Sequence, residues 1–153
     1  MLAAIRDGEF NFPLLMHVLG AMVLVGGLIT AASFQYAGWR GDREAAFARL
    51  AFRTLLFVAL PAWFVMRIGG QWIESKYDFP EGDEPAWLGI GYVTADLGGV
   101  VLLLSIVLAG VGVRQVARRE TGASVLVRIA TVLVTLIVLA YVITIWAMAG
   151  KPD

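Results

Sequence analysis

Hydrophobic residues in this chain fall into four long runs, and short charged segments separate them. The runs cover about residues 12–34, 50–68, 90–113 and 125–149. An α-helix of about 20 residues is long enough to cross a hydrocarbon core of about 30 Å. The pattern therefore predicts an all-α fold, an integral membrane four-helix bundle in which residues 1–153 form a single transmembrane domain.

The first run, Phe12 to Phe34, contains no formally charged side chain and one titratable residue, His17. A stripe of residues at alternating steps of three and four comprises His17, Gly20, Leu24, Gly27 and Ala31. Such spacing places the stripe on one face of a helix, and small residues favour close helix packing in lipid. We expect His17 to face protein rather than lipid, and the run to be a retained span rather than a signal peptide.

Composition agrees with a membrane protein. Of the 153 residues, 59% are hydrophobic and 16% are charged, with a mean hydropathy of +0.80. A small soluble core could not bury this much apolar surface. The chain has no cysteine, which excludes disulfides, thiolate metal sites and thiol catalysis.

The second run contains Pro61, which should kink the helix or free the carbonyl of Phe57. We expect residues 41–49 to form a helical lead-in to this span, and Gly69 with Gly70 to end it. An acidic loop over residues 69–87 should follow, with a turn between Pro80 and Pro85.

The distribution of basic residues predicts the orientation. Segments 35–53 and 114–128 hold four arginines each, whereas the opposite side holds Arg6, Arg67, Lys76 and Lys151. The positive-inside rule then places both termini and the acidic loop outside the cell, N-out and C-out. We expect a multi-pass protein of the bacterial plasma (inner) membrane.

This topology brings the scarce polar and sulfur-bearing residues of all four spans to the outer leaflet. The candidate ligand-binding residues are His17, Met66, Arg67, Tyr92, Asp96, Tyr141 and Thr144. Arg67 and Asp96 are each the only charge of their sign near that depth, so we expect an ion pair, either structural or acting as a gate or substrate contact.

His17 has two interpretations. It could donate a hydrogen bond to a neighbouring helix, or share a proton relay with Asp96. Alternatively, neutral imidazole is a common metal ligand, and His17 with Met66 and Met148 would suit Cu(I) or haem b. The sequence leaves the cofactor open.

The sequence contains no paired carboxylates within a span, no HExxH, no G-x-S-x-G and no phosphate-binding glycine loop. These absences favour a non-enzymatic role, and nothing indicates nucleic-acid binding. The lipid bilayer is the expected partner, with a homo-oligomer or a larger membrane complex as further options.

Three segments carry a family resemblance: HVLGAMVLVGG at His17 to Gly27, LPAWFVMRIGGQW at Leu60 to Trp72, and PAWLGIGYVTADLG at Pro85 to Gly98. They resemble small bacterial four-helix membrane proteins related to the copper-resistance D-type membrane domain, and to uncharacterised integral membrane families. The resemblance implies a plasma-membrane bundle with a functional His17 in metal or haem handling.

Three functions follow from these observations. The first is a small membrane protein that binds a small ligand or ion in an outer-leaflet pocket between its four helices. The second is a redox or metal-handling protein that binds haem b or copper through His17. The third is an accessory subunit whose glycine-rich faces pack on partner spans.

Overall fold

A computed structural model of the chain describes residues 8, 11–39, 43–76, 86–118 and 123–150, which are helical almost throughout. Within these ranges, four helices are long and apolar enough to cross a membrane: Asn11–Gly38, Glu44–Glu74, Ala86–Ala117 and Val125–Gly150. The predicted all-helical architecture with four candidate spans is confirmed.

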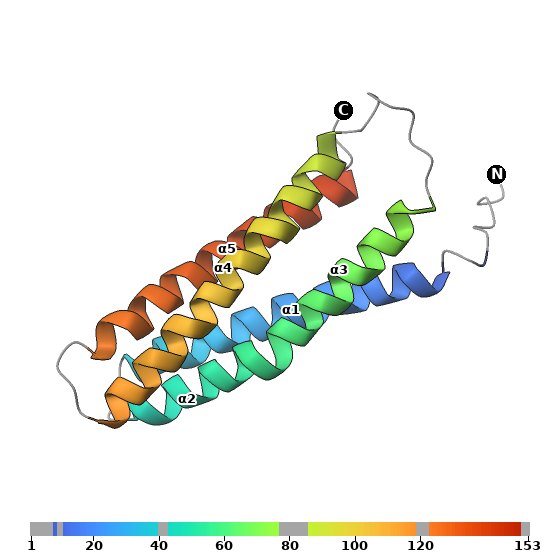
Figure 1. Cartoon of the computed structure of the whole chain (residues 1–153). Coiled ribbons are helices and arrows are strands. Elements are labelled where there is room, and N and C mark those ends of the chain that lie inside the picture. Colours follow the sequence, from blue (N-terminus) through green and yellow to red (C-terminus); the bar gives the residue numbers. More distant parts are fainter. Residues whose placement is uncertain (1–7, 9–10, 40–42, 77–85, 119–122, 151–153) are drawn as a thin grey trace.

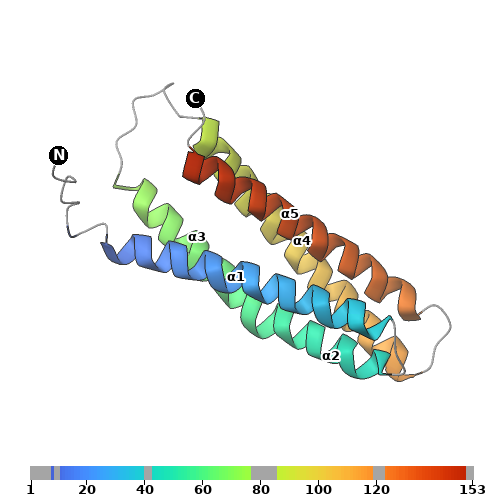
Figure 2. The ribbon, with the colours of Figure 1, turned by 180° about the vertical axis from the view of Figure 1, so that it is seen from behind.

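The helices run alternately up and down (Figure 1). In order they are α1 (Asn11–Gly38), α2 (Glu44–Thr54), the π-helical turn η2 (Leu55–Ala59), α3 (Leu60–Glu74), α4 (Ala86–Ala117) and α5 (Ala123–Gly150). Helix α1 packs mainly on α3, and α4 mainly on α5, whereas α3 and α4 touch little. Figures 1 and 2 show the α1–α3 pair diverging from the α4–α5 pair at the end where α1 begins and α5 ends.

The second span is one continuous helix with an irregular turn in its middle. In η2 the N–H of Leu60 donates to the carbonyl of Leu55, which widens the turn immediately before Pro61. A π turn is a recognised cause of helix irregularity beside proline, in agreement with the expectation for Pro61. The predicted lead-in is helical from Glu44 onward, and residues 41 and 42 lie outside the described ranges.

The prediction that Gly69 and Gly70 end this helix is wrong, because α3 continues to Glu74. The glycines instead allow α1 to approach. A Cβ on Gly69 would lie 2.6 Å from the backbone N of His17 and 2.9 Å from the carbonyl of Pro13. The connection to α4 is correspondingly shorter than the predicted 69–87 loop; its turn between Pro80 and Pro85, like the chain termini, lies outside the described residues.

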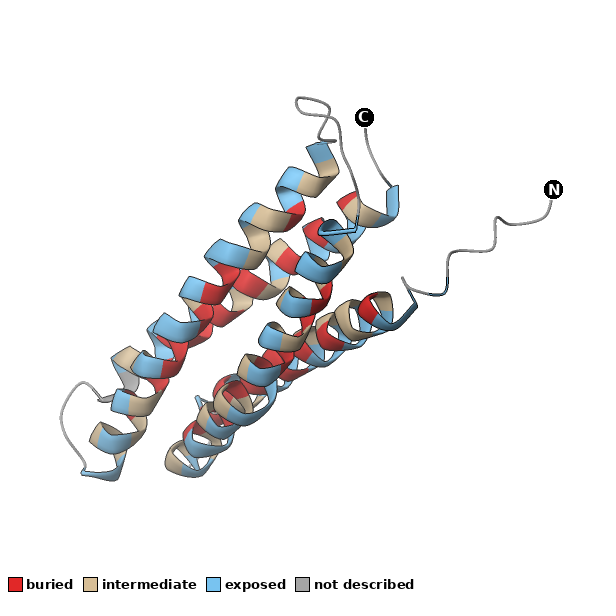
Figure 3. Ribbon diagram, turned by 45° about the vertical axis from the view of Figure 1, so that its right-hand side comes forward, coloured by how far each residue is buried: buried red, intermediate tan, exposed pale blue. Residues whose placement is uncertain are grey.

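The predicted stripe on α1 is the face that packs inside the bundle. Gly20, Leu24, Gly27 and Ala31 are buried, and His17 is partly buried. A Cβ on Gly20 would lie 2.5 Å from the backbone N of Met66, so helix backbones approach closely there. In Figure 3 the buried positions follow the faces where helices meet, and exposed positions lie on the outside.

The centre of the bundle is apolar. Leu24, Leu28, Leu55 and Val134 are completely buried there, and Leu102 almost completely. Large hydrophobic side chains also cover the outer surface of every span, which is the arrangement expected where the outer surface contacts lipid rather than water.

Candidate functional site

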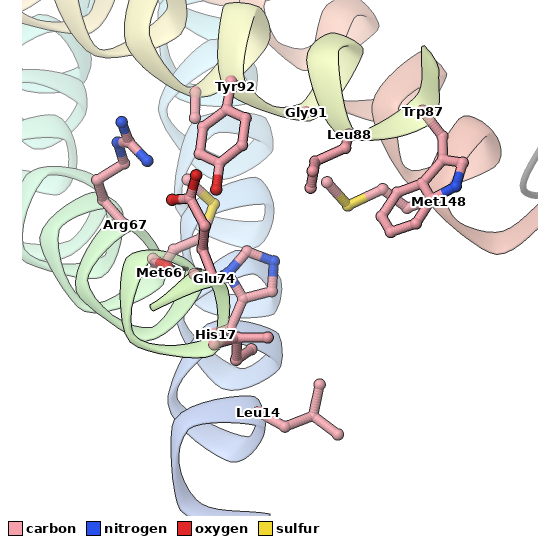
Figure 4. Close-up of a pocket in the computed structure, with 13 residues that line it drawn as sticks. Leu14, His17, Met66, Arg67, Glu74, Trp87, Leu88, Gly91, Tyr92 and Met148 are labelled. Atoms are coloured by element: carbon pink, nitrogen blue, oxygen red, sulfur yellow. Dashed lines mark hydrogen bonds between the residues drawn. The ribbon is translucent and has the colours of Figure 1, made fainter. Parts of the chain in front are cut away.

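A cavity of about 360 Å³ lies at the end of the bundle where the two helix pairs diverge (Figure 4). Residues from α1, α3, α4 and α5 all contribute to its wall. The lining residues are Leu14, His17, Met66, Arg67, Gly70, Ile73, Glu74, Trp87, Leu88, Gly91, Tyr92, Ala95 and Met148. Mostly apolar walls with a few polar groups are typical of small-molecule sites.

His17 is held by the backbone of the facing helix. Its Nδ1 lies 2.9 Å from the carbonyl oxygen of Met66. A carbonyl can only accept a hydrogen bond, so Nδ1 carries the hydrogen, and Nε2 of the neutral ring keeps a lone pair. Figure 4 shows the other side of the ring turned toward the space between His17 and Met148. The predicted hydrogen bond to a neighbouring helix is confirmed, and it leaves an acceptor at the cavity.

Gly70 leaves room for the imidazole ring of His17. A Cβ on Gly70 would lie 3.0 Å from Nδ1 of His17, closer than most side-chain contacts. Together with the close backbone approach at Gly69, this fixes the imidazole between α1 and α3.

Arg67 and Asp96 form the predicted ion pair across α3 and α4, with 3.0 Å between Nη2 and Oδ1. The Arg67 side chain is 19% exposed and that of Asp96 is 58% exposed. The Arg67 guanidinium also lies 5.2 Å from the centre of the Tyr92 ring. Arg67 lines the cavity, but Figure 4 shows its guanidinium pointing away from the space between His17 and Met148.

Trp63 of α3 contacts α4 next to the cavity. Its Nε1–H donates to the carbonyl of Ala95 at 2.9 Å, and its ring covers Gly99, where a Cβ would overlap with it. Ala95 itself lines the cavity, so this hydrogen bond holds a residue of the cavity wall to α3.

The structure brings only some of the predicted site residues together. Five of the predicted residues line the cavity: His17, Met66, Arg67, Tyr92 and Met148. Asp96 does not line it but is paired with Arg67, which does.

Tyr141 and Thr144 are not among the lining residues and belong to the packing of α4 on α5. The Thr144 hydroxyl donates to Oγ1 of Thr94 at 2.8 Å, and Tyr141 is buried beside Gly98.

Several lining residues were missed by the sequence analysis, notably Glu74, Trp87 and Leu88. Glu74 had been assigned to the acidic loop because Gly69 and Gly70 were expected to end the helix. Its spacing from Arg67 and Gly70 is seven and four residues, which is the helical repeat of a shared face. Continuing that repeat past the glycines would have identified Glu74.

The polar groups of the lining residues determine which ligands the cavity could bind. In the described part of the chain, no group of three or more His, Asp or Glu side chains could hold a metal ion. The acceptors among the lining residues are Nε2 of His17, the carboxylate of Glu74 and, weakly, the sulfurs of Met66 and Met148, and Trp87 and Tyr92 add an N–H and an O–H donor.

Comparison of the chain with protein-family models, curated proteins and solved structures found no match. The resemblance to the copper-resistance D-type membrane domain therefore stays a prediction.

Proposed function

We propose that the protein is a multi-pass protein of the bacterial plasma membrane, with the cavity end of the bundle on the outer side. Two observations support this orientation. The four helices are long and apolar enough to span, and the arginines at the opposite end, among them Arg49, Arg53, Arg114 and Arg128, are numerous. Lys and Arg concentrate on the cytoplasmic side of membrane proteins.

Within that setting, we propose that the protein is non-enzymatic and binds a small ligand in the cavity. The observation that carries this proposal is the cavity of about 360 Å³ to which all four spans contribute. Its apolar walls suit the body of a ligand, and the anchored imidazole of His17 offers a polar contact within them.

The methionines allow a direct test in detergent micelles. Met66 and Met148 line the cavity, whereas Met22 is 68% exposed on the outer surface of α1. We expect the ¹³C-methyl NMR signals of Met66 and Met148 to shift saturably when 4-phenylbutanol is added. The Met22 signal should shift only in proportion to the probe concentration, because the probe also partitions into the micelle.

A substitution that fills the cavity, compared with the same substitution outside it, tests where the probe binds. Leu88→Trp should abolish the saturable shift, because the larger ring would occupy the cavity. Leu104→Trp should preserve it, because Leu104 is exposed on the same helix and does not line the cavity. If Met66 and Met148 shifted only linearly in the wild-type protein, the binding proposal would be wrong.

A second function is favoured by one specific observation. The backbone carbonyl that holds Nδ1 of His17 is the kind of support that orients imidazole ligands, and two thioethers share the cavity with Nε2. His17, Met66 and Met148 fit the soft donor set of a Cu(I) site, or an axial pair for haem b. A bound metal or haem would supply electron transfer or metal delivery.

An absorption spectrum and metal analysis of the purified protein test this second function. A Soret band or stoichiometric copper, lost in His17→Ala, would support it. Wild-type protein with neither would exclude haem and copper from the purified protein.

The accessory-subunit hypothesis depended on glycine faces that pack on partner spans. Gly20, Gly27, Gly69, Gly98 and Gly99 all have close neighbours within the chain itself. These glycines therefore pack on other helices of the same chain. Stable co-purification of a larger complex would be the evidence for a partner protein.

A further inference from the structure

We infer that the ligand of this cavity is an amphipathic amine, a molecule with one protonated amino group on an apolar body. The inference rests on the proposed ligand-binding function and names the chemical class that the cavity would select. It follows from the balance of charge, the hydrogen-bonding character of the polar groups, and their distribution along the cavity.

The charge balance of the cavity favours a cation. Arg67 is the one cationic side chain among the lining residues, and its guanidinium is paired with Asp96 and points away from the central space. Glu74 adds a second carboxylate. Asp96 is not a lining residue, but it neutralises the Arg67 guanidinium, so the Glu74 carboxylate is the formal charge that remains among the lining residues, and a single positive charge on the ligand would neutralise it.

The hydrogen-bonding groups point to a donor on the ligand. Nδ1 of His17 is already engaged with the Met66 carbonyl, so neutral His17 presents only the Nε2 lone pair to the cavity. The Glu74 carboxylate is also an acceptor. An ammonium group carries up to three N–H donors and no acceptor, and therefore complements both groups, whereas an ionised carboxylate or phosphate could donate to neither of them.

Aromatic side chains strengthen the preference for a cation. Trp87 and Tyr92 both line the cavity, and the faces of such rings attract ammonium groups. The Arg67 guanidinium already lies 5.2 Å from the centre of the Tyr92 ring, so this ring is engaged with a cation of the protein itself.

The cavity has a carboxylate at its mouth and apolar side chains deeper inside, as an amphipathic amine requires. Glu74 is the last residue of α3 and Trp87 is the second residue of α4, so both lie at the mouth. Met66 is eight residues deeper in α3, about 12 Å along the helix, and Ala95 likewise lies deeper in α4 than Trp87. The amine would lie near Glu74 and His17 and its body would extend toward Met66 and Ala95.

Three probes with the same phenylbutyl body isolate the role of charge: 4-phenylbutylamine, 4-phenylbutanol and 4-phenylbutyrate. Binding is measured by the saturable Met66 and Met148 methyl shifts, and probes are compared at equal Met22 shift, which equalises their loading of the micelle. We expect the amine to bind about tenfold more tightly than the alcohol, and the carboxylate to bind most weakly.

Glu74→Gln should lower the affinity for the amine about tenfold, to near that of the alcohol, and should lower the affinity for the alcohol much less. Glu44→Gln is the matched control, because Glu44 begins α2 at the opposite end of the bundle, and it should leave both affinities unchanged.

Equal affinity for the amine and the alcohol in the wild-type protein, or the tightest binding by the carboxylate, would overturn the amine inference but leave the proposed binding function intact. Saturable binding by none of the three probes would overturn both. A preference for the amine that survived in Glu74→Gln would contradict the role assigned to that carboxylate.

Discussion

Gly69 is where the close approach of α1 and α3 depends most on a missing side chain. A Cβ there would meet backbone atoms of His17 and Pro13, which cannot rotate away. We expect Gly69→Ala to destabilise the protein by about 1–3 kcal/mol, as overpacking usually does. The midpoint of thermal unfolding in a fixed detergent measures the effect.

Gly26→Ala is the matched control for this prediction. No atom lies within 4 Å of a Cβ placed on Gly26, and alanine is the better helix former by about 1 kcal/mol. This variant should unfold at the same temperature as the wild type or slightly higher. If Gly69→Ala behaved like Gly26→Ala, the close approach of α1 and α3 would be wrong.

Gln35 is a buried amide near the end of α1 opposite to the cavity. Neither its Oε1 nor its Nε2 has a hydrogen-bond partner among the described residues, whereas the equally buried hydroxyls of Ser105 and Thr131 bond to carbonyls of their own helices. A buried amide without partners costs about 1–3 kcal/mol. We expect Gln35→Met, which preserves the shape, to stabilise the protein by about 1 kcal/mol in the same unfolding assay.

A lower unfolding midpoint for Gln35→Met would contradict this prediction and would indicate that the amide is hydrogen-bonded in the detergent-solubilised protein. Thr131→Val provides a comparison. It removes a hydroxyl that already has a partner in Val127, so it should change the midpoint less than Gln35→Met does.

The contact between α3 and α4 is sparse, and a few polar interactions account for much of it. Besides the Trp63 hydrogen bond, it depends on the Arg67–Asp96 pair. Removing one partner leaves an unpaired charge within a candidate membrane span, which costs more than removing both. We therefore expect the double variant Arg67→Gln/Asp96→Asn to be destabilised by less than the sum of the two single substitutions.

The double-mutant cycle should give a coupling energy of about 1 kcal/mol, in the range measured for polar contacts between membrane helices. Trp63→Phe offers a comparison within the same contact, because it deletes the donor to Ala95 together with the indole atoms nearest Gly99. A coupling energy indistinguishable from zero would show that the pair does not hold α3 to α4.

Hydrophobic patterning predicted the helices well and their ends poorly, for a physical reason. Long apolar runs have few alternatives to a helix in a bilayer, because every backbone polar group must be satisfied within the segment. Gly69 and Gly70, by contrast, permit either a helix end or a close helix contact. Only the position of α1 decides between the two, and that position is a tertiary property.

The candidate site shows the same limit. Sequence order gave the depth of Tyr141 and Thr144 correctly relative to His17, but depth does not specify rotation about the helix axis. Both residues turned out to face α4 rather than the cavity. The cavity itself arises from the divergence of two helix pairs, which no single helical pattern encodes.

The fold places the arginine-rich turns and the cavity at opposite ends of the bundle, so the orientation of the molecule decides which compartment the cavity faces. Absence of cysteine makes this testable without background labelling. Ser75 is exposed just beyond α3 at the cavity end, and Ala117 is exposed at the last residue of α4 at the other end. A membrane-impermeant maleimide should label Ser75→Cys in intact cells and Ala117→Cys only after permeabilisation.

Val107→Cys distinguishes orientation from insertion itself. Val107 is 60% exposed in the middle of α4, so in a bilayer its replacement would face lipid. The thiolate that attacks maleimide does not form in hydrocarbon, and this variant should stay unlabelled even in permeabilised cells. Labelling of Ala117→Cys but not Ser75→Cys in intact cells would place the cavity toward the cytoplasm and leave the fold intact. Labelling of Val107→Cys as fast as that of Ser75→Cys would mean that the outer surface of α4 meets water, and the membrane-spanning arrangement itself would then be wrong.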